Sequence, residues 1–297
     1  MAAFTLAHLS DPHLPPLPRP RPAELMGKRV LGYLNWTRNR HRHHRRDVVD
    51  VLVSDLRAQV PDHIAVTGDL VNLALEAEFA PALAWLNGVG PPDQVTVVPG
   101  NHDAYVRATR DRFAETWQSY LAGDEATNGA VAFPSLRRRG PVALIGVSSA
   151  VPTPPLMATG WLGKSQMEAL ERLLAALASE QAFRILLIHH PLRSSARGKR
   201  LTDSSDLLSL LKRYGVEMVL HGHDHVHSTI WVEGPDGSSI PVIGVPSASA
   251  LAHRHYPHAA YNLFSIARDG EGWRCRQMVR GINDARQVKE IRRVDLL

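Results

Sequence analysis

The sequence predicts a layered α/β fold, and two observations lead to this prediction. Over the first two thirds of the 297 residues, short apolar and β-branched runs alternate with stretches of helical apolar spacing. That alternation is typical of strands layered against helices. After residue 221 only strand-like runs follow, separated by turn sequences at residues 234–237 and 269–272. A mostly antiparallel sheet is therefore expected to complete the fold.

Each element follows from its own stretch of sequence. The apolar runs predict buried strands at residues 4–9, 63–67, 94–98, 142–147, 184–188 and 216–220. The stretches between them predict helices at residues 47–59, 75–87, 104–121, 165–178 and 204–214. The closing strands are expected at residues 229–232, 240–245, 261–267 and 273–279. We find neither an internal repeat nor a linker between two units, so residues 1–297 are expected to form a single domain.

An insertion at about residues 12–46 interrupts the alternation. Six prolines within residues 12–22 exclude regular structure there and favour an extended loop. The apolar side chains of residues 23–36 recur at roughly helical spacing and predict an amphipathic segment. Residues 38–46 then form a dense basic run with five arginines. Such a run is either a solvated face or a surface that contacts an anionic partner.

Composition indicates a globular protein with an unusual number of histidines. Hydrophobic residues make up 44% of the chain and charged residues 21%, and no run approaches the roughly 18 apolar residues of a membrane span. The single cysteine, Cys275, excludes an internal disulfide. The first residues lack the basic flank and long apolar region of a signal peptide, so a cytoplasmic location is expected. Sixteen histidines and a net charge of +5 point to metal or phosphate chemistry.

Five of the predicted strands are followed by side chains that bind metals or phosphate. In layered α/β folds, ligands bind beyond the carboxyl ends of the strands, so these side chains are expected to converge at one edge. In an Asp-x-His or His-x-His pair both side chains lie on the same side of an extended segment, so each pair can hold one ion. The motifs are Asp11-Pro-His13, Gly68-Asp69, Gly100-Asn-His-Asp103, His189-His190 and Gly222-His-Asp-His225.

This ordered set of motifs, D-x-H, G-D, G-N-H-D, H and G-H-x-H, resembles the calcineurin-like metallophosphoesterase superfamily. All five motifs match in order between residues 11 and 225. The resemblance implies a four-layer α-β-β-α sandwich, in which two central β-sheets are flanked by helices. It also implies a site for two metal ions. One ion would be bound by Asp11, His13 and His225, the other by Asn101, His189 and His223, with Asp69 between them.

The chemistry of these ligands favours catalysis on an anionic phosphate. Seven ligands with one bridging carboxylate leave open positions on both ions for water and substrate. Two divalent ions and two aspartates leave a residual charge of about +2, which suits a phosphate. Imidazole, carboxylate and amide donors suit Mn, Fe, Zn or Ni. The site therefore predicts a metal-dependent phosphoric ester hydrolase, in which a metal-activated hydroxide attacks the phosphorus.

Further roles are expected for residues beside these ligands. The resemblance implies that His102 contacts the phosphate and assists the leaving group, with Asp103 as its orienting partner. The resemblance assigns the metal to the first histidine of the pair at residues 189–190 and leaves the second beside the ligand set. Residues expected to contact the substrate are His190, Arg193, Arg197, His253 and His255.

The motifs leave the substrate open, because substrate identity resides in the loops rather than in the metal site. A phosphodiester, either a cyclic nucleotide or a small diester, is the first prediction. The alternative is a lipid-linked pyrophosphatase of the UDP-diacylglucosamine type, because residues 23–46 have the character of a segment that lies on an anionic membrane at its inner face. Nucleic acid is disfavoured as a substrate, since few aromatic residues accompany the basic run.

A non-enzymatic scaffold on the same fold is the remaining alternative. Such a scaffold, having lost catalysis, should lack some of the metal ligands, and none is missing. The sequence does not specify an oligomeric state.

Overall fold

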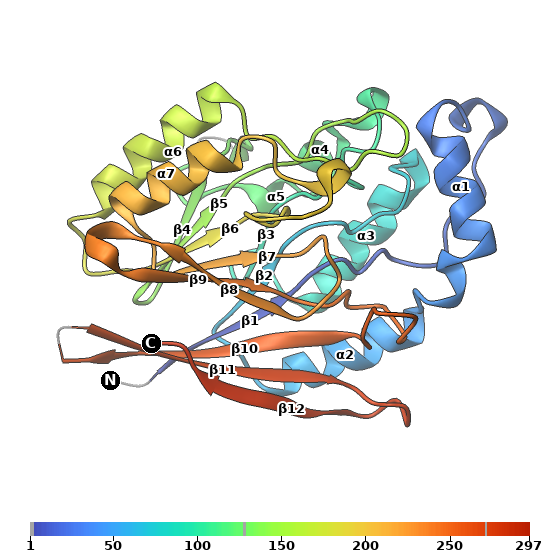
Figure 1. Ribbon diagram of the computed structural model, residues 1–297. Helices are drawn as coiled ribbons and strands as arrows, with labels where there is room; N and C mark the ends of the chain where they lie inside the picture. Colours follow the sequence, from blue (N-terminus) through green and yellow to red (C-terminus); the bar gives the residue numbers. More distant parts are fainter. Residues whose placement is uncertain (1–2, 127–128, 271) are drawn as a thin grey trace.

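The computed structural model describes residues 3–126, 129–270 and 272–297. Two six-stranded β-sheets lie face to face, with helices on their outer sides (Figure 1). The strand order is β12-β11-β10-β1-β2-β3 in the first sheet and β4-β5-β6-β7-β9-β8 in the second. The predicted four-layer α-β-β-α sandwich is confirmed.

The bounds of the elements agree with most of the predicted ranges. The strands are β1 (Phe4–Leu9), β2 (His63–Val66), β3 (Val95–Val97), β4 (Ser135–Arg139), β5 (Val142–Gly146), β6 (Phe183–Leu187), β7 (Met218–His221), β8 (Ser228–Glu233), β9 (Ser239–Gly244), β10 (Ala260–Asp269), β11 (Gly272–Ile282) and β12 (Val288–Asp295). The α-helices are α1 (Lys28–Arg38), α2 (Arg46–Ala58), α3 (Glu76–Val89), α4 (Arg112–Thr116), α5 (Gln118–Leu121), α6 (Lys164–Leu177) and α7 (Ser204–Tyr214). Among the described residues, no helix is both long enough and apolar enough to cross a membrane.

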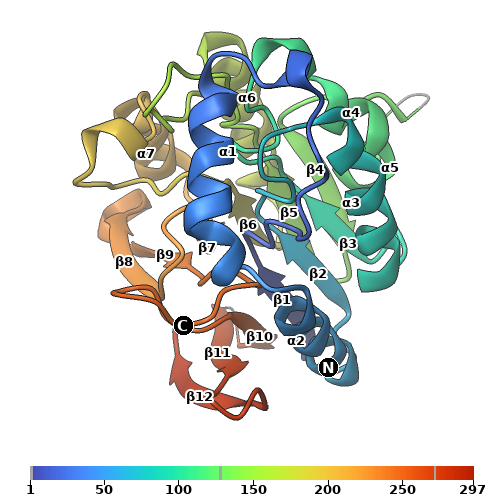
Figure 2. The same cartoon turned by 90° about the vertical axis from the view of Figure 1, so that its right-hand side faces the viewer.

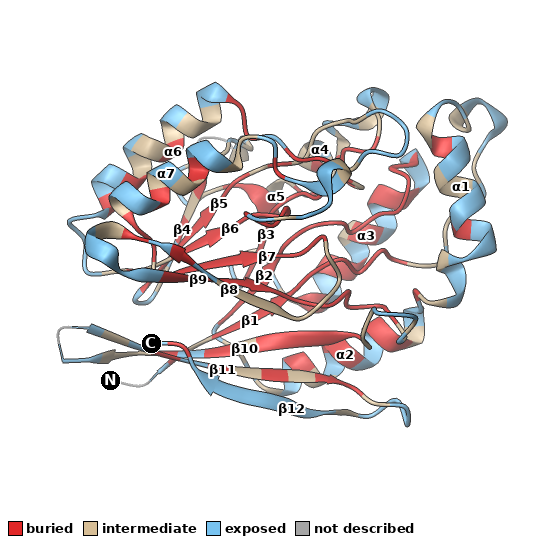
Figure 3. Cartoon of the chain, in the orientation of Figure 1, coloured by how far each residue is buried: buried red, intermediate tan, exposed pale blue. Residues whose placement is uncertain are grey.

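Three apolar clusters join the four layers. Leu6, Leu144 and Phe264 belong to the cluster between the two sheets, and all three are buried. A second cluster packs α2 and α3 against the first sheet, and a third packs α6 and α7 against the second. Figure 3 shows the same division, with buried residues along the central strands and exposed residues on the outer sides of the helices and along β12. These buried faces explain the apolar periodicity of the sequence.

Three sequence expectations need correction. Residues 104–121 form a short 3-10 helix (Arg107–Thr109) and then α4 and α5 instead of one helix. The closing strands do not form a sheet of their own, because β9 pairs parallel with β7 and β10 pairs antiparallel with β1. The sequence analysis also missed β4 and β12, which are rich in arginine and lie at sheet edges. Charged side chains are common on edge strands, where they weaken the apolar alternation.

The topology brings the carboxyl ends of the central strands to one end of the sandwich. Strands β1, β2 and β3 run parallel, as do β5, β6, β7 and β9. Helix α1 lies at this end, at the right of Figure 1 and in front in Figure 2. The predicted amphipathic segment is therefore a helix next to the loops that carry the five motifs.

Candidate metal centre

The backbone at the motifs adopts a conformation that is uncommon outside glycine. Five of the seven predicted ligands have positive φ angles: Asp11 at 53°, His13 at 37°, Asp69 at 57°, His223 at 69° and His225 at 57°. Such left-handed residues cost conformational energy and concentrate at functional sites. The surrounding fold therefore holds these side chains in fixed positions before any ion binds.

The glycines of the motifs are required by close approach between loops. A Cβ on Gly68 would lie 2.5 Å from the backbone nitrogen of Gly100, and Gly68 itself has a φ of +93°. A Cβ on Gly100 would overlap the carboxylate of Asp69, and one on Gly222 would overlap that of Asp11. The glycines thus allow the loops after β2, β3 and β7 to bring their ligands together.

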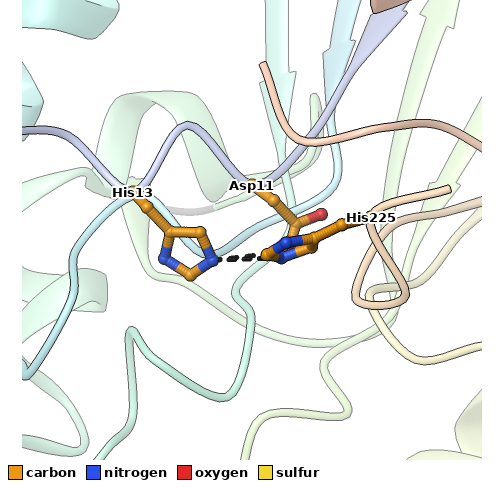
Figure 4. Close-up of side chains that lie close together, drawn as sticks. All are labelled: Asp11, His13 and His225. Atoms are coloured by element: carbon orange, nitrogen blue, oxygen red, sulfur yellow. Dashed lines mark hydrogen bonds and ion pairs between the residues drawn. The ribbon is translucent and has the colours of Figure 1, made fainter. Parts of the chain in front are cut away.

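The first ligand set comes from the loops after β1 and β7. The Nε2 atom of His225 lies 3.0 Å from Oδ1 of Asp11 and 3.2 Å from Nε2 of His13. The distance from His13 Nε2 to Asp11 Oδ1 is 3.8 Å. Figure 4 shows the three side chains, with His13 and His225 directed toward one another beside Asp11. The structure therefore brings together Asp11, His13 and His225 as predicted.

The second ligand set comes from the loops after β3, β6 and β7. The Oδ1 atom of Asn101 lies 3.2 Å from Nε2 of His189 and 2.9 Å from Nδ1 of His223. These two ring nitrogens are 3.3 Å apart. All three residues are buried.

Asp69 lies between the two sets. Its Oδ2 atom is 3.7 Å from His13 Nε2 and 3.4 Å from His189 Nε2, so a single oxygen faces both groups of ligands. Its Oδ1 atom accepts a hydrogen bond of 2.7 Å from the backbone N–H of His102. This is the position that a bridging carboxylate must have.

The spacing of the donor atoms fits divalent ions. Ligand bonds of about 2.1 Å in tetrahedral or octahedral geometry place neighbouring donors about 3.0–3.4 Å apart. Most of the distances within each set fall in or near that range. Burial also holds the pKa values of His13 and His223 well below their ordinary value, so both rings are neutral and present lone pairs. These lone pairs face other donor atoms of the site, and a shared cation stabilises such an arrangement.

Backbone carbonyls orient two of the histidines. His189 Nδ1 donates to the carbonyl of Thr67 at 2.6 Å, and His13 Nδ1 donates to that of Val71 at 3.2 Å. With the proton on Nδ1, each ring presents its Nε2 lone pair to the site. Such contacts fix the tautomer and the orientation of metal-binding imidazoles.

The charges within the site depend on one another. Burial opposes ionisation of Asp69, but the rings of His189 and His102 and their hydrogen bonds hold the pKa of its carboxyl well below the ordinary value. Burial likewise opposes a charge on His189, yet the carboxylate of Asp69 raises the pKa of His189 to about 10. The site therefore favours a positive charge next to Asp69, either a proton or a metal ion.

The structure corrects the predicted partner of His102. The Nδ1 atom of His102 donates to the backbone carbonyl of Asn72, and its ring stacks on Tyr105 with centroids 5.1 Å apart. Asp103 instead accepts hydrogen bonds from four backbone N–H groups, those of Gly100 and residues 69–71. Asp103 therefore braces the ligand loops and does not orient the His102 ring.

A cavity of about 330 Å³ opens onto the ligands. Of the predicted substrate residues, His253 lines it. Arg193 and Arg197 are exposed and lie outside the lining, as does His255, whose ring packs on Tyr256. From the stretch after β6, Lys199 lines the cavity instead.

His190 is buried behind the metal ligands. Its Nδ1 atom lies 2.7 Å from the hydroxyl of Ser149, and its Nε2 atom lies 3.2 Å from the carbonyl of Ala158. Its ring packs on His223 with centroids 4.5 Å apart. Both nitrogens are used within the protein, so this residue supports a ligand and does not face the substrate cavity.

The insertion forms a wall of the cavity, which the sequence analysis did not foresee for individual residues. His44 is buried, with Nδ1 2.8 Å from the hydroxyl of Ser249 and its ring 4.9 Å from that of the ligand His13. Further lining residues from the insertion are Asn35, Asn39, Arg40 and His43. The solvated-face interpretation is therefore wrong for this part of the basic run. The available signal was the histidines of the run, of which His43 and His44 line the cavity whereas His41 is exposed.

The comparisons with known proteins agree with the motifs. The model of the calcineurin-like phosphoesterase family matches residues 4–227, which include all seven predicted ligands. The chain belongs to this family, and its Asp and His residues are positioned for a dinuclear divalent metal site. A search of the curated proteins finds no match.

Solved structures of low sequence identity share the fold. A dimetal phosphatase from Danio rerio superposes with a TM-score of 0.64 at 13% identity, over 99% of both chains. A purple acid phosphatase from yellow lupin gives 0.60 at 15% identity, over 97% of this chain and 53% of that one. A 5'-nucleotidase precursor from Thermus thermophilus gives 0.53 at 13% identity, over 99% of this chain and 54% of that one. The chain thus spans about half the length of the latter two proteins.

Proposed function

We propose that the protein hydrolyses a small phosphodiester, such as a cyclic nucleotide or a glycerophosphodiester, at the dinuclear centre. The observation that carries this proposal is the cavity of about 330 Å³, which begins at the metal ligands and extends beyond them to residues 250–256. Sites for small molecules measure about 300–1,000 Å³. The cavity therefore has room for both ester groups of a diester around one phosphoryl group.

The side chains of the site would have different roles in the hydrolysis. When bound, two divalent ions supply an activated water and neutralise phosphoryl charge. Asp69 fixes the relative position of the two ligand sets through its single shared oxygen. The hydrogen bond from His102 Nδ1 to Asn72 fixes that ring and directs its Nε2 atom to the cavity side, where it reaches the phosphoryl group or the leaving oxygen.

The outer cavity suits a planar leaving group. The rings of His43 and His253 stack with centroids 3.7 Å apart, and Tyr256 lines the same region. Aromatic and imidazole rings stack on planar heterocycles, including nucleobases. This stacking pair supports a nucleotide as the diester, whereas a glycerophosphodiester would use only the phosphoryl end of the cavity.

A side-by-side substrate screen tests the proposal. Protein reconstituted with Mn or Zn is assayed on bis(p-nitrophenyl) phosphate, a cyclic nucleotide, a glycerophosphodiester and p-nitrophenyl phosphate at fixed salt. We expect turnover of at least one natural diester, and loss of that turnover on chelation. Hydrolysis of the monoester alone, with no natural diester accepted, would make the protein a phosphatase and contradict the proposal.

A second candidate, hydrolysis of a lipid-linked pyrophosphate at a membrane surface, is supported by helix α1. The helix turns an apolar stripe to the outside, with exposed fractions of 39% for Val30, 44% for Leu31 and 40% for Leu34. The same helix contributes Asn35 to the cavity lining. An apolar stripe and a basic run beside an active-site mouth fit an anionic lipid whose headgroup enters the cavity.

Vesicle binding distinguishes the second candidate from the first. The double variant Leu31→Glu/Leu34→Glu should abolish binding to anionic vesicles and leave hydrolysis of a small chromogenic diester unchanged. The control Ile291→Glu changes an exposed apolar residue on β12 and should bind like wild type. Binding should weaken as salt rises, because headgroup contacts are screened within about 10 Å at 0.1 M salt. Absence of vesicle binding by wild type would eliminate this candidate.

A further inference from the structure

Arg40, the first residue of the 3-10 helix Arg40–Arg42, lies outside every metal-binding motif and yet faces the metal centre. Its Nη1 atom lies 3.4 Å from Nε2 of His102. The side chain lines the cavity together with the ligands His13, Asp69 and Asn101. A residue of the insertion thus forms part of the cavity wall next to the predicted metal ligands.

The guanidinium of Arg40 lacks a counter-ion of its own. Among the residues that the structure describes, none forms an ion pair with it, and its contact with His102 is the single hydrogen bond found. A guanidinium carries five N–H donors, so four of them remain for a ligand. The nearby carboxylates Asp69 and Asp11 belong to the predicted metal ligands. Arg40 is half-buried, and a positive charge that is partly removed from water is stabilised when an anion meets it.

In the contact between Arg40 and His102, the tautomer of His102 leaves the guanidinium as the donor. Because His102 Nδ1 donates to the carbonyl of Asn72, the neutral ring presents a lone pair at Nε2. That atom accepts a hydrogen bond from Nη1 of Arg40. Arg40 supplies N–H donors in the planar fork that matches two oxygens of a phosphate.

The backbone around Arg40 is fixed in place. Its carbonyl accepts from the backbone N–H groups of His43 at 3.0 Å and His44 at 2.9 Å. The end of the turn is tied to the loop after β9, since Arg45 N–H donates to the Ser249 carbonyl and Leu251 N–H donates to the His43 carbonyl, both at 2.9 Å. A donor held on such a frame loses little entropy when a ligand binds.

We propose that Arg40 is a substrate-binding residue that donates hydrogen bonds to a phosphoryl oxygen beside His102. The proposal rests on the proposed hydrolysis of a phosphoric ester at this site and adds a specific contact to it. It assigns a role in the active site to the insertion, whose guanidinium adds to the positive charge of the dinuclear centre. The ligand class is any phosphate that presents two free oxygens, and inorganic phosphate is the simplest member.

Binding of inorganic phosphate to the metal-loaded protein tests this contact without relying on turnover. Titration calorimetry is run on wild type, Arg40→Met and the control Arg42→Met, which removes an exposed arginine from the same run. We expect all three to hold two ions per chain, and phosphate binding to weaken about ten- to a hundredfold in Arg40→Met alone, the effect of losing charge-assisted hydrogen bonds. Equal phosphate affinity in Arg40→Met and wild type would overturn the proposal.

Two further variants separate binding from support of the His102 ring. Arg40→Lys keeps the charge but loses the fork, so its phosphate affinity should lie between those of wild type and Arg40→Met. If Arg40→Met loses its metal ions, Arg40→Lys becomes the test, and wild-type affinity in that variant would refute the contact. Arg40→Ala should regain phosphate affinity on addition of guanidinium, which a purely structural role would not produce.

The two proposals can fail separately. Phosphate binding that depends on Arg40, without turnover of any natural diester, would refute the proposed function and keep the contact. Diester turnover with phosphate binding unchanged by Arg40→Met would keep the function and refute the contact.

Discussion

Replacing His102 by alanine tests the division between metal binding and catalysis. The ring donates to the Asn72 carbonyl, accepts a hydrogen bond from Arg40 and stacks on Tyr105. Each such hydrogen bond is worth about 1 kcal/mol, against a usual stability of about 5–15 kcal/mol, so the variant should fold. Because His102 is outside the proposed ligand set, both ions should remain bound.

The expected kinetic effect is much larger than the structural one. A group that assists proton transfer contributes about 10²–10⁴ in rate, or about 3–5 kcal/mol of the barrier. If His102 assists the leaving group, His102→Ala should slow esters of poor leaving groups, such as alkyl esters, more than p-nitrophenyl esters, because p-nitrophenolate leaves without a proton.

The assay combines metal analysis with kinetics on the two kinds of ester. The geometry makes this comparison necessary, because donor atoms of His102, His13 and Asp69 lie close enough together to hold an ion themselves. Two ions per chain with a selective loss on poor leaving groups would support the proposed role. A drop to about one ion per chain would show that His102 is a ligand, and an equal loss on both esters would refute the role in proton transfer.

Three other variants test the account of the site. Asp69→Asn should lose both ions, because it removes the negative charge of the carboxylate that faces both ligand sets. Asp224 lies between two ligands in the sequence but outside the ligand set, so the control Asp224→Asn should keep both ions. Metal analysis compares the two variants. In the metal-free protein the pKa of His189 is raised from an ordinary 6.5 to about 10. Protonation of this ring therefore stabilises the fold. The contribution is complete below about pH 6.5 and is lost as the pH rises through about 10. Urea unfolding across that range should therefore show a decline that His189→Asn lacks, and metal uptake at pH 7 should release a proton. Glu78→Ala removes the acceptor for three backbone N–H groups in residues 72–75 and should lower the free energy of unfolding by about 2–4 kcal/mol in urea titration; an unchanged value would show that this loop does not depend on Glu78.

The sequence was sufficient for the layers and for the convergence of the ligands. Buried strands and amphipathic helices leave periodic apolar patterns, and the rule that ligands gather at the carboxyl ends of parallel strands brings together residues as distant as Asp11 and His225. The edge strands β4 and β12 were not predicted because charged side chains interrupt their apolar alternation; those of β12 are mostly exposed, whereas Arg137 of β4 is buried.

The cavity wall could not be predicted residue by residue. In the sequence Arg40 is one of five arginines in a run, and only the turn at Arg40–Arg42 and its ties to the loop after β9 distinguish it from exposed Arg42. The partner of His102 was likewise hidden, because a backbone carbonyl such as that of Asn72 leaves no signature in the residue types. Asp103 was predicted as the partner of His102 because it is adjacent in the sequence. In the structure its carboxylate instead accepts hydrogen bonds from the backbone of the ligand loops.

The proposed chemistry depends on two divalent ions held between ligands from five loops. Metal analysis of purified protein, after reconstitution with Mn or Zn and removal of free metal, tests it most directly. We predict close to two ions per chain, and loss of phosphoester hydrolysis when a chelator removes them. Fewer than one ion per chain in a folded protein with all seven ligand side chains intact would contradict the dinuclear account.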